Sequence, residues 1–188
     1  MTTSVQPSLR TFTIDPQHSR LGFSVTHMGF STVRGRFEQF DGAVRMSSDD
    51  LSTLEAEASV QTASITTGTE DRDQHLRSDD FFAVEEHPMM TFETQEVREV
   101  EGNTFTLVGD LTIRDTTKPV ELEAEFLGEG TDPWGGTRVA FEAETAINRK
   151  EFGLTWNQVL EAGGVLVGTK VNISLEIQAV QEEDGDAA

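Results

Sequence analysis

Residues 71–88, DRDQHLRSDDFFAVEEHP, form the stretch of this sequence with the most groups able to do chemistry. The stretch holds two of the chain's four histidines, six acids and two arginines, a density typical of a metal site or an acid–base site. However, His75 and His87 are twelve positions apart, and no motif in the chain places two histidines on one ion. The acids at 70, 71, 73, 79 and 80 also lack the calcium-loop pattern, so we predict no metal site and expect them to pair with Arg72 and Arg77.

The sequence also contains no pattern typical of nucleophilic catalysis. The chain contains no cysteine, which excludes disulfides, cysteine-bound zinc, iron–sulfur clusters and thiol nucleophiles. It has no G-x-S-x-G motif, and the glycine-rich segment 128–133 lies between predicted strands rather than before a helix that could hold a phosphate. We therefore assign no catalytic residue and predict that the protein is not an enzyme.

His27 is the histidine with the most informative position. It falls in phase with Leu21, Phe23 and Val25, so it should point inward near the end of a strand, where an imidazole needs a hydrogen-bond partner. Two interpretations remain open. His27 is either a hydrogen-bonded core residue or a polar contact at the mouth of a cavity for a mostly apolar ligand.

The charge balance limits the partners of the protein. The formal net charge is −20, from 34 acids and 14 basic residues, and such a surface repels nucleic acid and anionic lipid. The first residues lack a basic region followed by an apolar one, and no stretch approaches about 18 apolar residues. We expect a soluble, cytoplasmic protein that binds no nucleic acid and does not insert stably into membranes.

The elements that must position any site are strands, because apolar and polar residues alternate with a period of two. Residues 21–27 and 54–61 show the pattern clearly. In the second run Leu54, Ala56, Ala58 and Val60 face inward, and the small alanines leave space inside. Similar runs recur along the chain, with turn residues between them, at 105–107, 111–113, 120–126, 139–143 and 171–177. About eight or nine strands with short connections predict an all-β antiparallel barrel or sandwich.

The main exception to the strand pattern is the segment that follows residue 66. Thr67 or Thr69 is an N-cap candidate with acids in the next turn, which predicts a short helix at about residues 69–77 and a second turn near residues 78–82. We expect one domain over residues 1–181, followed by an acidic tail at 182–188.

Four blocks of the sequence resemble the YceI-like family. They are residues 14–44, 67–92, 109–122 and 147–180, and together they span nearly the whole chain in the family's order. The resemblance implies an eight-stranded, lipocalin-like antiparallel barrel with a helical insertion at about 69–82. It also implies an elongated apolar pocket for polyisoprenoid, quinone-like or other amphiphilic lipids, with no catalytic activity and no required cofactor.

Inward phase and the family blocks together give a set of residues expected to line the pocket. Phase gives Phe23, Val25, His27, Phe92, Leu111, Ile113, Phe141 and Ala143, and the blocks add Phe30, Phe37, Phe152, Leu154, Trp156, Leu166 and Val167. Arg149 and Asn157 could be polar contacts, with a surface or bracing role as the alternative. In the insertion, Leu76, Phe81 and Phe82 should dock on the barrel as a lid or rim, braced by Arg72, Asp73, His75 and Arg77.

Three functions compete at this point. The leading one is binding, storage or transport of an isoprenoid-type lipid such as a quinone, with a neutral head group because of the acidic surface. The second is a structural or interaction protein whose barrel is filled by side chains, and which forms a homodimer through an exposed strand edge. The third is an enzyme for a small hydrophobic substrate with His27 or His75 as general base.

Overall fold

The computed structural model describes residues 8–47 and 50–182, which are mostly β-strands. The strands are β1 (Arg10–Ile14), β2 (Arg20–His27), β3 (Ser31–Phe37), β4 (Phe40–Ser47), β5 (Asp50–Gln61), β6 (Ile65–Thr66), β7 (Met89–Glu101), β8 (Thr104–Ile113), β9 (Thr116–Thr131), β10 (Thr137–Asn148) and β11 (Val167–Gln181). The helices are α1 (Glu70–Arg77) and the 3-10 helices η1 (Thr62–Ser64) and η2 (Arg149–Phe152). Of the predicted acidic tail, residues 183–188 lie outside the described residues.

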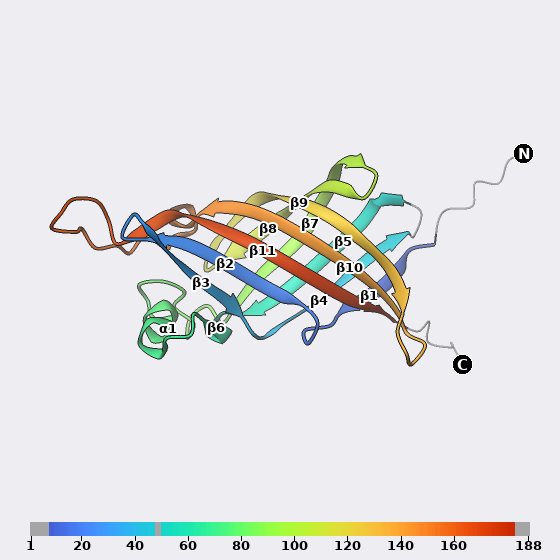
Figure 1. Cartoon of the computed structure of the whole chain (residues 1–188), viewed down its shortest axis with the longest axis horizontal. Coiled ribbons are helices and arrows are strands. Elements are labelled where there is room, and N and C mark those ends of the chain that lie inside the picture. The colour runs from blue at the N-terminus through green and yellow to red at the C-terminus, as the bar shows by residue number, and fades with distance from the viewer. Residues whose placement is uncertain (1–7, 48–49, 183–188) are drawn as a thin grey trace, which may run out of the picture.

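The strands close into an eight-stranded antiparallel barrel (Figure 1). Its order is β1-β4-β5-β7-β8-β9-β10-β11, and β11 pairs back with β1. The predicted all-β barrel with a helical insertion is therefore confirmed. The helix itself covers residues 70–77, with Thr69 at the N-cap position but without a side-chain capping bond.

The long strand β11 has two successive partners on the same side. Its last residues pair with β1, and its earlier residues, Val167 to Glu176, pair with β2. The corner between β1 and β2 is fixed by Ser19, whose hydroxyl donates to the carbonyl of Gln178 and accepts from the Gln178 N–H. The wall beyond β2 consists of β3, which pairs with β6 only at Arg36 and Phe37. In Figure 1, α1 and β6 lie together at one end of the barrel, beside β3, and we call this the α1 end.

The alternation in β5 shows why these sequences form a barrel wall. Leu54 and Val60 are buried, whereas Glu55 and Gln61 are exposed, as a strand with one apolar face requires. Burial of such faces supplies the main driving force for closing the sheet.

The end of the barrel where β1 begins and β11 ends is filled by side chains. Phe12, Met46, Val139 and Ala179 are at most 1% exposed and pack in one cluster. These residues seal the base, so any internal space must lie toward the α1 end.

A charged network lies beside the base. Asp15 accepts hydrogen bonds from the Arg138 guanidinium and from His18 Nδ1, each at 2.8 Å, and Arg138 also donates to Asp132. The hydrogen bond from Arg138 is the main cause that lowers the pKa of Asp15 to about 2, although burial opposes it. The ionised carboxylate thus stabilises the folded state.

This network predicts a specific acid sensitivity. Because the folded-state pKa of Asp15 is depressed, its contribution to stability is present above about pH 4 and is lost as the pH falls toward 2. We expect Asp15→Asn to remove about 2 kcal/mol of the difference in unfolding free energy between pH 5 and pH 2. Urea unfolding at both pH values measures it, with Asp41→Asn, at an exposed position, as control. Equal acid sensitivity of the two variants would contradict the prediction.

Candidate ligand-binding cavity

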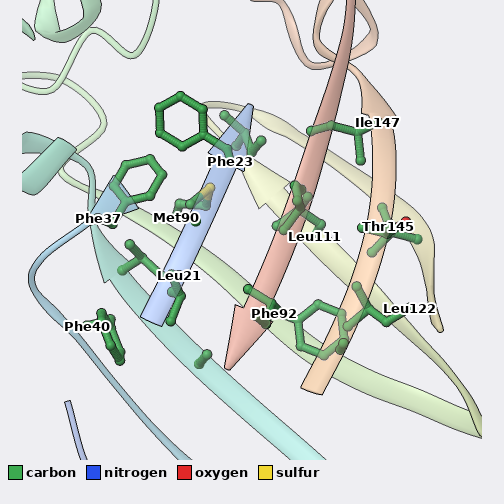
Figure 2. A pocket seen from close by; sticks show the side chains of 18 of the residues that line it. Leu21, Phe23, Phe37, Phe40, Met90, Phe92, Leu111, Leu122, Thr145 and Ile147 are labelled. Carbon is green, nitrogen blue, oxygen red and sulfur yellow. The ribbon is translucent and has the colours of Figure 1, made fainter. Parts of the chain in front are cut away.

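The interior of the barrel encloses a cavity of about 260 Å³ (Figure 2). Side chains reach it from β2, β5, β7, β8, β9, β10 and β11, among other elements. On β11 alone the lining runs from Val167 to Ile177, which is about 30 Å at roughly 3.3 Å per residue. The cavity is thus long, and it exceeds the roughly 150 Å³ of apolar cavities that stay dry and bind benzene.

The lining is almost wholly apolar. Its polar members are Glu57, Thr91, Thr145 and Arg149. The side chain of Glu57 is 59% exposed and pairs with Arg45 on the outer surface, so it adds no charge to the interior. Within the described part of the chain, Arg149 is the one cation that borders the cavity.

Two glycines allow aromatic rings to lie flat against the inner wall. A Cβ atom at Gly109 would lie 2.3 Å from the ring of Phe92, and one at Gly35 would lie 2.4 Å from the ring of Phe23. Both rings line the cavity and are labelled in Figure 2. A side chain at either glycine would push a ring into the space that a ligand would use.

The segment that follows β6 forms a lid over the α1 end of the cavity. Leu76 from α1 and Phe81 and Phe82 from the next turn all line the cavity. Phe82 packs edge-on against Phe37 of β3, with ring centroids 5.6 Å apart. The prediction that these three side chains dock on the barrel is confirmed.

Buried polar contacts hold the lid in place. Asp73 is 3% exposed and accepts hydrogen bonds from the backbone and hydroxyl of Thr67 and from the hydroxyl of Thr66. Burial raises the pKa of Asp73, but these hydrogen bonds outweigh it and leave the pKa below its ordinary value. Arg72 donates to Thr67, and Arg77 donates to the carbonyls of Ala63 and Ile65. The predicted bracing by these residues is confirmed, but the expected pairing of the acids with Arg72 and Arg77 is mostly wrong: within the described residues Arg77 pairs with Glu70, whereas Arg72 bonds threonines.

The two histidines of this segment have separate partners. His75 bonds Asp80 at 2.8 Å, and its ring packs edge-on against Phe81 and Trp156. His87 lies 3.7 Å from Asp115 instead. Among residues 8–47 and 50–182, no three or more His, Asp or Glu side chains are grouped so that they could hold a metal ion.

Arg149 braces the loop between η2 and β11. It is 3% exposed and donates four hydrogen bonds to backbone carbonyls, which belong to Leu154, Trp156, Val167 and Gly168. No carboxylate of the described chain pairs with it, and burial lowers the pKa of its guanidinium. The sequence left two roles open for Arg149, a polar contact in the pocket and a brace. Its hydrogen bonds show the brace, and the residue also borders the cavity.

Asn157 completes the same brace. Its side-chain amide donates to the Val167 carbonyl at 2.7 Å and accepts from the Val167 N–H at 3.0 Å. These two bonds imitate a strand pairing, and they fix the point at which the loop rejoins the barrel.

Most of the residues predicted to line a pocket do border the cavity. They are Phe23, Val25, Phe37, Phe92, Leu111, Ile113, Phe141, Ala143, Leu154 and Val167. Residues that we did not select complete the lining, among them Leu21, Phe40, Leu54, Ala56, Ala58, Met90, Leu122, Thr145, Ile147, Val171, Ile173 and Leu175. The same period-two alternation, applied to every strand, would have found most of them.

The other predicted residues lie outside the lining. His27 has the inward phase and lies at the end of β2 opposite Val167, but its side chain is not part of the lining. Phe30 is 81% exposed, because it lies in the β2–β3 turn, where strand alternation no longer applies. Leu166 precedes β11 and uses its carbonyl to accept from the Met28 N–H.

Phe152 and Trp156 lie behind the lining rather than in it. Phe152 is 2% exposed within a cluster that includes Phe81 and Leu154. The ring of Trp156 lies 4.5 Å from that of His75 and 5.5 Å from that of Phe81, between centroids. Both residues support the lid and the loop from outside the cavity.

A closed antiparallel barrel with a long apolar cavity and a helical lid belongs to the architectural class with room for one small ligand. The sequence identifies the family: the model of the YceI-like domain matches residues 12–179, and the chain belongs to this family. A UPF0312 protein of Staphylococcus aureus strain N315 is 43% identical over 85% of this chain and 91% of the relative. A UPF0312 protein of Serratia proteamaculans strain 568 is 41% identical over 74% and 72%.

Solved structures share the fold. BcnA of Burkholderia cenocepacia has a TM-score of 0.77 at 19% identity, over 88% of this chain and 99% of that chain. The YceI protein of Campylobacter jejuni has a TM-score of 0.73 at 25% identity, over 84% and 90%. A polyisoprenoid-binding domain from Saccharophagus degradans has a TM-score of 0.66 at 15% identity, over 93% and 100%. Separately, none of the helices in the described residues is long and apolar enough to cross a membrane.

Proposed function

We propose that this protein binds, stores or carries an isoprenoid-type or other amphiphilic lipid inside its barrel. The observation that carries the proposal is the long, almost wholly apolar cavity bordered by β11 from Val167 to Ile177. Each buried CH₂ of a lipid chain contributes about 0.8 kcal/mol, so a long tail can bind tightly without elaborate polar recognition. An empty cavity of this size lowers stability, and an occupant removes that cost.

The head group that we propose is neutral and bears oxygen acceptors, as a quinone ring does. The net charge of −20 disfavours an anionic ligand. The almost wholly apolar lining points the same way, because it offers no site for a charged group: the guanidinium of Arg149 is already bonded to four backbone carbonyls. A head group of this kind needs few polar contacts.

The comparisons support this ligand class in general terms. The relative from Saccharophagus degradans is described as a polyisoprenoid-binding domain, and it shares the fold of this chain. The proposed role is binding rather than catalysis. A barrel filled by side chains, the competing structural function, fits poorly with a cavity of about 260 Å³.

Native mass spectrometry of the protein purified from its own host, followed by organic extraction, tests the proposal. We expect an adduct with the mass of a neutral, long-chain lipid, recovered in the organic phase. An apoprotein mass from the host, together with no uptake of a short-tailed ubiquinone analogue in vitro, would overturn the proposal.

A further inference from the structure

Two loops at the α1 end of the barrel expose large apolar side chains. Phe30 and Met28, in the β2–β3 turn, are 81% and 42% exposed. Val159 and Val165, in the loop before β11, are 77% and 44% exposed and face each other in a β-bridge. A hydrogen bond of 2.8 Å from the Met28 N–H to the Leu166 carbonyl joins the two loops. We call these four side chains the apolar tip.

The apolar tip projects from the body of the barrel. In Figure 1 the loop before β11 extends beyond the strands, beside the turn between β2 and β3. Single exposed apolar residues are ordinary on a protein surface, but a group of them on adjoining loops is typical of an interaction site.

The sequence around the tip is nearly free of acids, in contrast to the rest of the chain. Of the 34 acids, none lies between residues 16 and 37, and Glu161 is the only one between residues 152 and 175. Arg34 and Lys170 are exposed on the adjoining strands, and neither forms an ion pair with a residue that the structure describes. The two loops of the tip therefore carry little negative charge of their own, while the acids of the α1 segment lie at the same end of the barrel.

The spacing of these groups suits the surface of a bilayer. Arg34 lies four residues along β3 from Phe30, or about 13 Å at roughly 3.3 Å per residue. Peripheral segments immerse their apolar side chains by about 5–10 Å, so an immersed tip would leave Arg34 at the level of the head groups.

The tip is also continuous with the cavity. Val167 directly follows Leu166, Val25 lies three residues before Met28 in the β2–β3 turn, and both valines line the cavity. A lipid tail that reached the tip from a bilayer would therefore meet the cavity lining next.

We propose that the apolar tip docks reversibly on the surface of a lipid bilayer, with Phe30 and Val159 immersed in its interfacial region. Docking is a property separate from what the cavity holds, so the two can be tested independently. A zwitterionic surface is the partner, because the overall charge of the protein opposes an anionic one.

Flotation of the full chain with phosphatidylcholine vesicles tests the docking. We expect Phe30→Ser combined with Val159→Ser to lower the vesicle-bound fraction, expressed as a partition coefficient, by about tenfold. The matched control is Leu127→Ser combined with Trp134→Ser, which removes two other exposed apolar side chains, 49% and 86% exposed, from the β9–β10 hairpin. This control should bind as the wild type does.

Two further measurements test whether the loss of vesicle binding comes from the apolar tip itself. The single variants Phe30→Ser and Val159→Ser, on different loops, should each lower binding, so one misfolded variant does not decide the result. Lipid content by native mass spectrometry should stay unchanged in all of them, which separates docking from cavity binding. Absence of wild-type flotation, or equal loss in the control, overturns the proposal. It also fails if the tip variants instead abolish a dimer in sedimentation, since the tip would then bind a second copy.

Discussion

Replacement of Arg149 by methionine is expected to lower the free energy of unfolding by about 3–5 kcal/mol, because hydrogen bonds to a charged donor contribute roughly 1.5–3 kcal/mol each and the desolvation of the guanidinium offsets part of their sum. The guanidinium is 3% exposed and satisfies four backbone carbonyls, spread from Leu154 to Gly168. Methionine has a similar length but no donor, so these carbonyls would lose their hydrogen bonds. Urea unfolding followed by circular dichroism measures the change.

Two control variants test whether the loss of stability comes from the hydrogen bonds of Arg149. Arg149→Lys keeps the charge but cannot span four carbonyls, so it should recover only a small part of the lost stability. Arg34→Met removes an exposed arginine and should change stability by less than about 0.5 kcal/mol. If Arg149→Met were as stable as Arg34→Met, the brace would not hold the loop as described.

A large side chain that fills part of the cavity should weaken ligand binding strongly without unfolding the protein. Ala143 on β10 lines the cavity, and we expect Ala143→Phe to weaken retention of a short-tailed ubiquinone analogue by about tenfold or more, because a ring occupies space that the tail needs. Its unfolding free energy should change by less than about 1.5 kcal/mol, because the cavity offers room for the ring. Ligand retention on gel filtration measures the effect.

The matched control for this variant lies three residues along the same strand. Ala146 is exposed on the outer face of β10, so Ala146→Phe makes the same chemical change outside the barrel. It should retain the ligand as the wild type does. Equal retention by both variants would show that the ligand does not occupy the cavity.

Sequence alternation predicted the strands of an antiparallel barrel or sandwich because it reports burial of one face of each strand, and the resemblance to the YceI-like family implied the barrel. Leu54, Ala56, Ala58 and Val60 were assigned to the inside from their period alone, and all four line the cavity. A closed sheet is the arrangement in which many such faces share one interior without leaving edges. The N-cap candidates Thr67 and Thr69 predicted the short helix, and the family resemblance implied eight strands where alternation had given eight or nine.

The same reasoning failed where a strand ends. His27 continues the phase of Val25, yet phase gives only the direction of a side chain and not whether the cavity reaches it. Phe30 was placed inside from its family block, although a residue in a turn is not oriented by the pleat. The role of Arg149 depends on a loop that returns to it after up to 19 residues, and no local pattern encodes that return.

The successive pairing of β11 with β1 and then with β2 leaves the barrel wall unevenly hydrogen-bonded. Strand β1 is paired on both sides and packed through Phe12, whereas residues 31–35 of β3 have β2 as their only strand partner among the described residues. Backbone amides of this part of β3 that lack a strand partner should therefore exchange with solvent faster than those of β1. Local opening of the wall should begin at β3, while the rest of the barrel stays folded.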